Sequence, residues 1–250
     1  MLHGLPLLGP APRTIHILAR AEAERADRGI VQHARRGDAP VVAVRGLLAT
    51  SVARTVADLA SRGSLTSGVV AADAALSPGP FGERTPATTR SALEHAASTL
   101  PPGPDRDRSL AVIGFADGRA ESPLESVSRI AMGLVGAPPP DLQSSVEDLL
   151  GFRARLDFAW PSFGLVGEAD GAVKYRSAAL RRGRTLSEVF ADQRRRESLI
   201  RAMGFRVVRW GWPLASRPDR MAALLRDAGL PVAARCTIGG LDAPAIRPAH

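Results

Sequence analysis

Three acidic side chains lie close together in the stretch RLDFAWPSFGLVGEADG, residues 155–171. Within it, the loop-forming residues PSFG separate two segments in which apolar and polar side chains alternate, a pattern that predicts a β-hairpin. Closing this hairpin pairs Trp160 with Leu165, which sets Asp157 directly opposite Glu168 on one face of the sheet. Like charges in opposed positions destabilise a strand pair, so the sequence requires something that offsets their repulsion.

Two interpretations of this acidic face are open. In the first, the face is solvated and arginines neutralise it along a cross-strand ladder, with Arg155 opposite Asp170 on the same side as the other acids. In the second, Asp157 and Glu168 bind a divalent cation such as Mg²⁺, which takes one or two carboxylates and keeps several water molecules. Because the ladder leaves the Asp157–Glu168 pair unneutralised, the second interpretation is favoured.

Composition limits the class of protein. The 250 residues suffice for one large domain or two smaller ones, and the net charge of +8 favours polyanionic partners. However, 32 of the 33 basic residues are Arg, a bias that a genome rich in arginine codons also produces. The chain has no apolar run long enough for a membrane span, no secretory signal, and a single cysteine, Cys236. These features predict a cytoplasmic protein without a membrane partner.

Two Pro/Gly-rich stretches, 77–86 and 100–108, divide the chain. Residues 1–100 mix strand and helix patterns, and their histidines are scattered, so we expect no active site there. Residues 105–230 predict a helix, three strands, a helix and a strand, which indicates an α/β fold with a mixed sheet. Residues 231–250 are expected to form a tail. In the first part, strands are predicted at 14–20, 29–35 and 40–46, and helices at 50–60, at 66–76 and from Thr85.

The sharpest helix signal in the second part is ESPLESVSRIAMGLV, residues 121–135. Ser122 suits the N-cap, and Glu125, three residues later, completes a capping box. After it, the sequence predicts a strand, the acidic hairpin, a helix at about 185–203 and a strand at 205–212.

These motifs resemble the PD-(D/E)XK nuclease superfamily, and within it the very-short-patch-repair endonuclease-like branch. That branch has a Ser/Thr-Pro-x-Glu helix start, a (Val/Leu)-Asp-Phe strand, Glu-x-Asp-Gly-x-x-His, and a basic helix leading into Gly-(aromatic)-x-Val-x-Arg. The resemblance covers about 90 residues in the same order. The corresponding segments are SPLE (122–125), LDF (156–158), EADGAVK (168–174), RRRESLIRAMG (194–204) and GFRVVRW (204–210).

The resemblance implies a mixed sheet flanked by helices, with Asp157 and Glu168 as metal ligands and Glu125 as a third acid from the helix. Asp170 stands where the superfamily has lysine. Lys174, the one lysine of the chain, stands where the branch often has histidine. It could stabilise charge in the transition state or orient the attacking water. The implied activity is a Mg²⁺- or Mn²⁺-dependent endonuclease that hydrolyses DNA phosphodiester bonds.

An arginine-rich segment follows the hairpin. Residues 176–201 hold eight arginines and three acids, a net charge of +5. Such a run is often a solvated helix face, but beside a carboxylate–metal cluster it is suited to bind phosphates. The predicted DNA contacts are Arg155, Arg194, Arg195 and Arg196. For Arg196, a contact with the acidic cluster is the alternative.

The first part resembles actinobacterial proteins related to AbiEi-type antitoxins of type IV toxin–antitoxin systems. The resemblance rests on HGLPLLGP (3–10), TIHILAR (14–20), TSVARTVADLA (50–60) and AADAAL (71–76). In those proteins a winged helix-turn-helix precedes this region, whereas this chain begins at MLHGLPLLGP, so we expect the winged helix to be missing. Two other functions stay open: a catalytically degenerate nucleic-acid-binding module, and a toxin–antitoxin-associated regulator with a protein partner.

Overall fold

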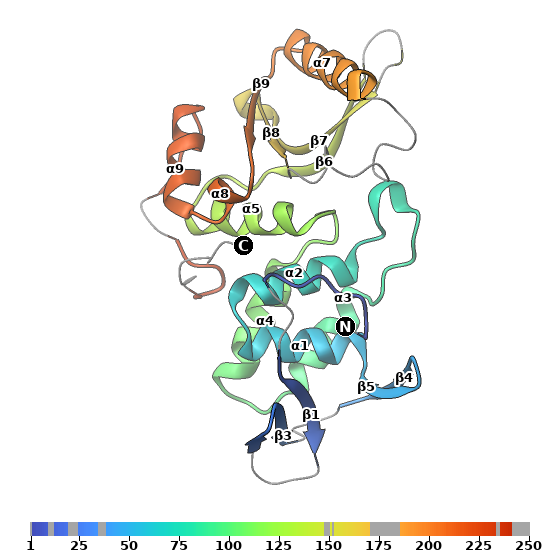
Figure 1. Ribbon diagram of the computed structural model, residues 1–250. Coiled ribbons are helices and arrows are strands. Elements are labelled where there is room, and N and C mark those ends of the chain that lie inside the picture. Colours follow the sequence, from blue (N-terminus) through green and yellow to red (C-terminus); the bar gives the residue numbers. More distant parts are fainter. Residues whose placement is uncertain are drawn as a thin grey trace. The chain divides into compact units, whose positions relative to one another are not determined.

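The computed structural model of the chain describes residues 2–9, 13–19, 25–34, 39–147, 151, 153–170, 186–233 and 236–241 (Figure 1). The fold is mixed α/β and divides into two compact units. The first comprises Met1–Glu121 with Gly239–Leu241, and the second comprises Ser122–Ile238. Among the described residues, no helix combines the length and the apolar character needed to cross a membrane.

The first unit opens with a small sheet of three strands. β1 (Ile15–Ala19) runs parallel to β3 (Ile30–Ala34), and β2 (Arg25–Asp27) pairs with β3 in the antiparallel direction. The strands predicted at 14–20 and 29–35 are confirmed, whereas β2 was not predicted.

A tight hairpin follows, formed by β4 (Val41–Val44) and β5 (Leu47–Thr50). Arg45 and Gly46 connect the two strands with φ angles of 51° and 79°. Two left-handed residues in succession are what a type I′ turn requires, and this turn matches the twist of the flanking strands. The sequence predicted β4, and β5 extends it into a hairpin.

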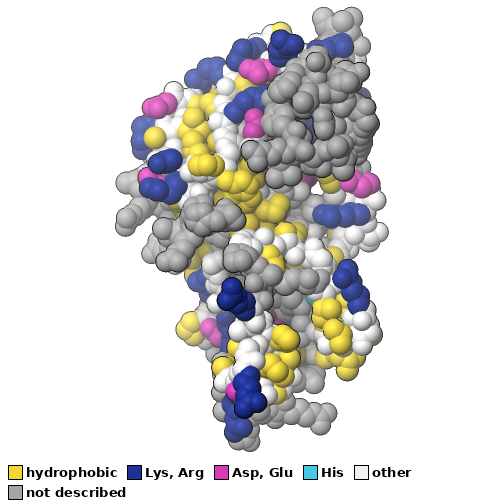
Figure 2. Space-filling view, viewed as in Figure 1, with side chains coloured by type: hydrophobic (Ala, Val, Ile, Leu, Met, Phe, Trp, Pro, Cys, Tyr) yellow, Lys and Arg dark blue, Asp and Glu magenta, His cyan; other side chains and the backbone are white. Residues whose placement is uncertain are grey.

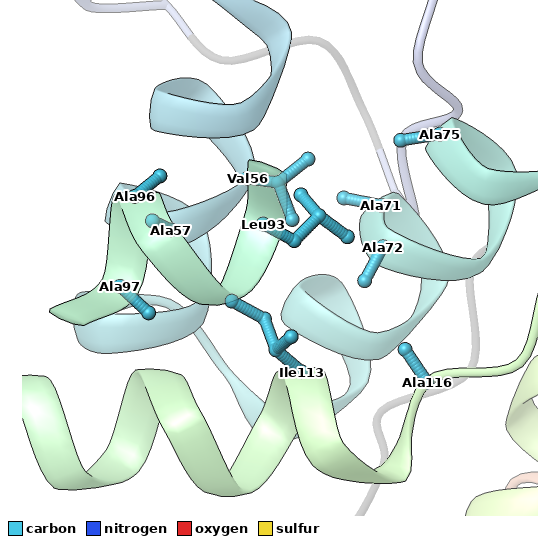
Figure 3. Packing of buried hydrophobic residues seen from close by; sticks show 10 residues of the cluster. All are labelled: Val56, Ala57, Ala71, Ala72, Ala75, Leu93, Ala96, Ala97, Ile113 and Ala116. Atoms are coloured by element: carbon cyan, nitrogen blue, oxygen red, sulfur yellow. The ribbon is translucent and has the colours of Figure 1, made fainter. Parts of the chain in front are cut away.

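Four helices form the core of the first unit: α1 (Val52–Arg62), α2 (Leu65–Leu76), α3 (Arg90–Ser98) and α4 (Pro104–Phe115). The core between them is built largely from alanines, with a few larger apolar side chains, which allows the helices to pack closely (Figure 3). The N-cap side chains that accept a first-turn N–H are Ser51, Ser64 and Thr89. Because Thr89 is the cap, α3 begins four residues after the predicted Thr85.

Because of helix α4, the boundary between the two units lies later in the chain than the sequence predicts. The sequence treats 100–108 as a linker and starts the second part at 105. However, Pro104 occupies the first helical turn, where its missing N–H is not needed, and Val112 and Ile113 are fully buried within the first unit. The boundary therefore lies after Glu121.

The second unit begins with α5 (Pro123–Leu134), capped by Ser122 as predicted. A four-stranded sheet follows, in the order β6 (Asp141–Glu147), β7 (Arg153–Trp160), β8 (Leu165–Ala169) and β9 (Arg206–Trp210). The first three strands are antiparallel, and β9 pairs with β8 in the parallel direction. The predicted mixed sheet is confirmed.

Helix α7 (Leu186–Ala202) connects β8 to β9 and lies on one face of the sheet, while α5 lies on the other (Figure 1). Two helices that the sequence did not predict, α8 (Trp212–Ala215) and α9 (Pro218–Asp227), follow the last strand. Part of the predicted tail packs against the end of α5, since the N–H of Cys236 donates to the carbonyl of Leu134 at 2.7 Å. Residues 242–250 of that tail lie outside the described residues.

Aromatic side chains fill the space between the sheet and α5. The ring of Phe158 lies 5.3 Å from that of Trp210 and 6.4 Å from that of Trp160, measured between centroids. Both indole N–H groups have partners: Trp210 donates to Ser128 Oγ and Trp160 to the carbonyl of Pro138, each at 2.7 Å. This fixes the rings in place, as a buried indole requires.

Candidate functional site

The acidic hairpin forms in the predicted register. Three residue pairs join β7 to β8, and the first of them is Trp160 with Leu165. One further step sets Asp157 opposite Glu168, and here the backbone ladder between β7 and β8 ends. Instead, Asp157 Oδ2 accepts a hydrogen bond from the backbone N–H of Ala169 at 2.9 Å. The side-chain carboxylate of Asp157 thus replaces a backbone carbonyl as the acceptor at the point where the ladder ends. We call Asp157 and Glu168 together the acidic fork.

Glu168 is buried in the acidic fork. Its residue is only 2% exposed, and its Oε1 accepts a hydrogen bond from Arg196 of α7 at 2.8 Å. The same Arg196 nitrogen also donates to the backbone carbonyl of Arg155. Burial and the charge of Asp157 raise the pKa of Glu168 to about 7, and the opposing effects of Arg196 and Arg209 are smaller. The interpretation of a solvated acidic face is therefore wrong for Glu168.

The partner of Asp170 also differs from the predicted ladder. Asp170 accepts a hydrogen bond from Arg209 at 2.9 Å, where the sequence had suggested Arg155. Arg209 lies on β9 opposite Glu168 and also reaches Glu197 of α7 at 3.4 Å. Sequence reasoning missed Arg209 as a site residue, although it is the second arginine of the segment GFRVVRW.

Glu125 is held on both carboxylate oxygens. Ser122 Oγ accepts the N–H of Glu125 at 3.2 Å and donates to its Oε1 at 2.7 Å, so the predicted N-cap is confirmed. Gln143 Nε2 donates to Oε2 at 2.8 Å. Glu125 is only 5% exposed, and Gln143 is the second residue that sequence reasoning missed.

Four of these residues occupy neighbouring positions across the sheet. The pairs on either side place Gln143 of β6 opposite Asp157 of β7, and Arg209 of β9 is paired with Glu168 of β8. The polar row is therefore Gln143, Asp157, Glu168 and Arg209, one residue from each strand. Helix α5 contributes Glu125 to it, and α7 contributes Arg196 and Glu197.

The other predicted residues are not members of the polar row. Arg194 and Arg195 are exposed on α7, in a region where Figure 2 shows basic side chains with a few acidic ones among them. Lys174 lies outside the described residues, as do the arginines between 176 and 184. Within the described part of the chain, no three acidic, histidine or cysteine side chains are grouped as a metal site would require.

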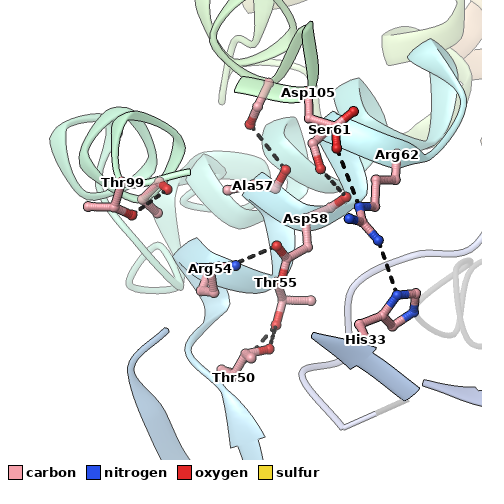
Figure 4. Close-up of polar contacts among 12 residues, drawn as sticks. His33, Thr50, Arg54, Thr55, Ala57, Asp58, Ser61, Arg62, Thr99 and Asp105 are labelled. Atoms are coloured by element: carbon pink, nitrogen blue, oxygen red, sulfur yellow. Dashed lines mark hydrogen bonds and ion pairs between the residues drawn. The ribbon is translucent and has the colours of Figure 1, made fainter. Parts of the chain in front are cut away.

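The polar contacts of the first unit connect its helices and strands to one another (Figure 4). The buried Arg54 pairs with Asp58 at 2.9 Å, and burial raises the pKa of Asp58 against the effect of this arginine. Two histidines that appear scattered in the sequence are brought together, with His16 Nδ1 2.8 Å from His33 Nε2. These contacts stabilise the unit and do not form a nucleophile–base pair of a catalytic type.

The sequence matches no protein-family model and no solved structure. It is similar to two curated proteins of Mycobacterium tuberculosis, "Uncharacterized protein MT2308" of strain CDC 1551 / Oshkosh and "Uncharacterized protein Rv2248" of strain ATCC 25618 / H37Rv. Each is 34% identical over 154 residues, which cover 62% of this chain and 54% of the relative. The chain thus spans about half the length of the curated relatives it matches.

Replacing Arg209 with Met is expected to destabilise the second unit by about 1–2 kcal/mol, because Asp170 and Glu197 lose a half-buried partner. The effect should be larger at pH 8 than at pH 5, since Arg209 also lowers the pKa of the buried Glu168. Urea unfolding at both pH values measures it. The exposed Arg206 on the same strand is the matched control, and an Arg206→Met variant with an equal loss would contradict a specific role for Arg209.

Proposed function

We propose that the second unit is a PD-(D/E)XK-type nuclease domain that hydrolyses DNA phosphodiester bonds with the help of Mg²⁺ or Mn²⁺. The observation that carries this proposal is the acidic fork. There, burial and, after it, the charge of the adjacent Asp157 raise the pKa of Glu168 to about 7. A bound cation would offset the repulsion between Asp157 and Glu168 and stabilise the charged form of the buried Glu168.

The chemistry of the fork fits such a cation. Mg²⁺ takes oxygen ligands and usually binds through one or two carboxylates, which Asp157 and Glu168 would supply. In addition, Arg196 Nε is buried without a hydrogen-bond partner among the described residues, so the polar surroundings of the fork are incomplete. When bound, the metal would polarise the scissile phosphate and lower the pKa of the attacking water.

The protein's own side chains would orient the substrate. Arg196 would hold the carboxylate of Glu168 in place through its hydrogen bond at 2.8 Å, while Arg209 brings a fixed positive charge to the position at which Asp170 replaces the superfamily lysine. The exposed Arg194 and Arg195 would contact phosphates farther along the DNA, which requires no base recognition. The role of Lys174 stays a prediction.

A second candidate function is a nucleic-acid-binding module that has lost catalysis. It is favoured by the ion pair between Arg196 and Glu168 at 2.8 Å, since an internal cation already faces the fork. The lack of a three-ligand group within the described residues also agrees with it. In that case, the resemblance of the first unit to AbiEi-type antitoxins would favour binding to a protein partner from a toxin–antitoxin system.

Metal-dependent melting together with plasmid nicking tests the proposal. We expect Mg²⁺ or Mn²⁺ to raise the melting temperature of the intact chain, because a ligand that binds only the folded state stabilises it, and to support nicking of supercoiled DNA. Asp157→Asn should abolish both effects. Asp141→Asn, at the exposed start of β6, should leave both intact. If metal does not change the melting temperature of the intact chain and the chain does not nick DNA, yet binds it in a salt-dependent manner, the binding module is the correct function.

A further inference from the structure

Gln143 has a backbone conformation that a strand residue rarely adopts. Its φ is 53°, in the left-handed region, although it lies within β6. The other described non-glycine residues with positive φ, Arg28 and Arg45, each precede a glycine in a turn between strands. Left-handed backbone is strained for a glutamine, and it persists only where surrounding contacts hold it.

The contact that holds Gln143 leads to the candidate site. Its side-chain amide donates to Glu125 Oε2 at 2.8 Å, and this acid of α5 is 5% exposed. With Ser122 Oγ on the other oxygen, the carboxylate of Glu125 has a fixed orientation. On the sheet, Gln143 lies opposite Asp157. One side chain therefore connects the acid of the helix with the polar row of the sheet.

The chemistry of glutamine suits this connection. Its amide donates a hydrogen bond to Glu125 without adding a charge, whereas a carboxylate here would repel the carboxylate of Glu125. Asparagine tolerates the left-handed region better but is one methylene shorter, and glycine tolerates it best but has no side chain. For stability alone, either would relieve the strain, so the stability of the strand does not account for a glutamine in this conformation.

We propose that Gln143 is a positioning residue of the acidic site: it fixes the carboxylate of Glu125 toward the polar row, at the expense of backbone strain. This inference rests on the proposed function. Gln143 acts through Glu125 and does not bind DNA itself.

The test compares Gln143→Asn and Gln143→Gly with the intact chain. We expect their melting temperatures without metal to stay close to that of the intact chain, because relief of the strain offsets the lost hydrogen bond. The metal-induced rise in melting temperature should shrink, and the nicking rate constant should fall about 10- to 100-fold, as is typical for groups that orient metal ligands. DNA affinity without metal should not change.

A double variant shows whether Gln143 acts on metal binding through Glu125 or independently of it. In the Glu125→Gln background, Gln143→Asn should cause no further loss, because residues that act as a unit are not additive. An added loss there would overturn the positioning role. So would full nicking and a full metal response in both single variants, with the proposed function still standing. An intact chain without metal response or nicking would remove the proposed function and this inference with it.

Discussion

Replacing Glu168 with Gln is expected to raise the thermal stability of the metal-free protein at pH 8 and to change it little at pH 5. Glu168 is 2% exposed, and burial together with Asp157 raises its pKa from 4.5 to about 7. The charged form is thus unfavourable in the folded state, even with Arg196 at 2.8 Å. Glutamine removes that charge and keeps an oxygen that can accept the hydrogen bond from Arg196.

The sign of the pH dependence follows from this raised pKa. Below pH 4.5 the carboxyl is neutral in both the folded and unfolded states, and its contribution to stability is fully present. As the pH rises from 4.5 to about 7, the unfolded state ionises first, and the folded protein loses that contribution. The shift corresponds to a difference on the order of 3 kcal/mol above pH 7. Metal-free melts of both proteins at pH 5 and pH 8 measure it.

The same substitution removes a proposed metal ligand, so the Mg²⁺-induced rise in melting temperature and plasmid nicking should both disappear. Asp170→Asn is the control for a simple charge effect, because it breaks the ion pair with Arg209 and is expected to lower stability at pH 8. A Glu168→Gln variant that is less stable than the intact chain at pH 8 would show that the Arg196 pair outweighs the repulsion. The binding module would then be the better function.

Replacing Gly167 with Ala is expected to destabilise the second unit by about 3 kcal/mol, the upper part of the usual range for overpacking. A Cβ at this position would lie 2.3 Å from Cη2 of Trp210 and 3.2 Å from the ring of Trp160. Trp210 cannot easily move away, because its indole is hydrogen-bonded to Ser128 and is in contact with Phe158. Urea unfolding of both proteins provides the measurement.

A second substitution distinguishes this clash from a general effect on the strand. Trp210→Phe shortens the ring that the new methyl group meets, so the double variant should be less destabilised than the sum of the two single variants. Simple additivity would argue against the clash. Because Gly167 precedes Glu168, we also expect Gly167→Ala to disturb the acidic fork. The metal-induced rise in melting temperature should then be smaller than in the intact chain.

The local part of the site could be predicted from the sequence. The short PSFG loop and the alternation around it determine the pairing of Trp160 with Leu165, and hence the opposition of Asp157 and Glu168. Likewise, the N-cap of α5 depends only on residues within one turn. The divergence of the strands after three pairs depends on side chains that replace the ladder, and alternation does not reveal it.

The long-range partners could not be predicted in this way. Arg209 reaches Asp170 because β9 pairs beside β8, and strand order is not a local property of the sequence. Gln143 depends on a single backbone angle in an otherwise regular strand pattern. The proline-rich stretch 100–108 predicts a linker, but Pro104 lies in the first turn of α4, where it begins a helix instead of ending a domain.

The parallel pairing of β8 with β9 has a consequence for the order of folding. The β7–β8 hairpin closes over a short loop, and hairpins form within about 1–10 μs. By contrast, β8 ends at Ala169 and β9 begins at Arg206, so their pairing must wait for a long loop to close. Both arginines that face Glu168 belong to this later segment. We therefore expect the hairpin to form while its two acids still repel each other, and docking of the last strand and helix to bring in the arginines that oppose this repulsion.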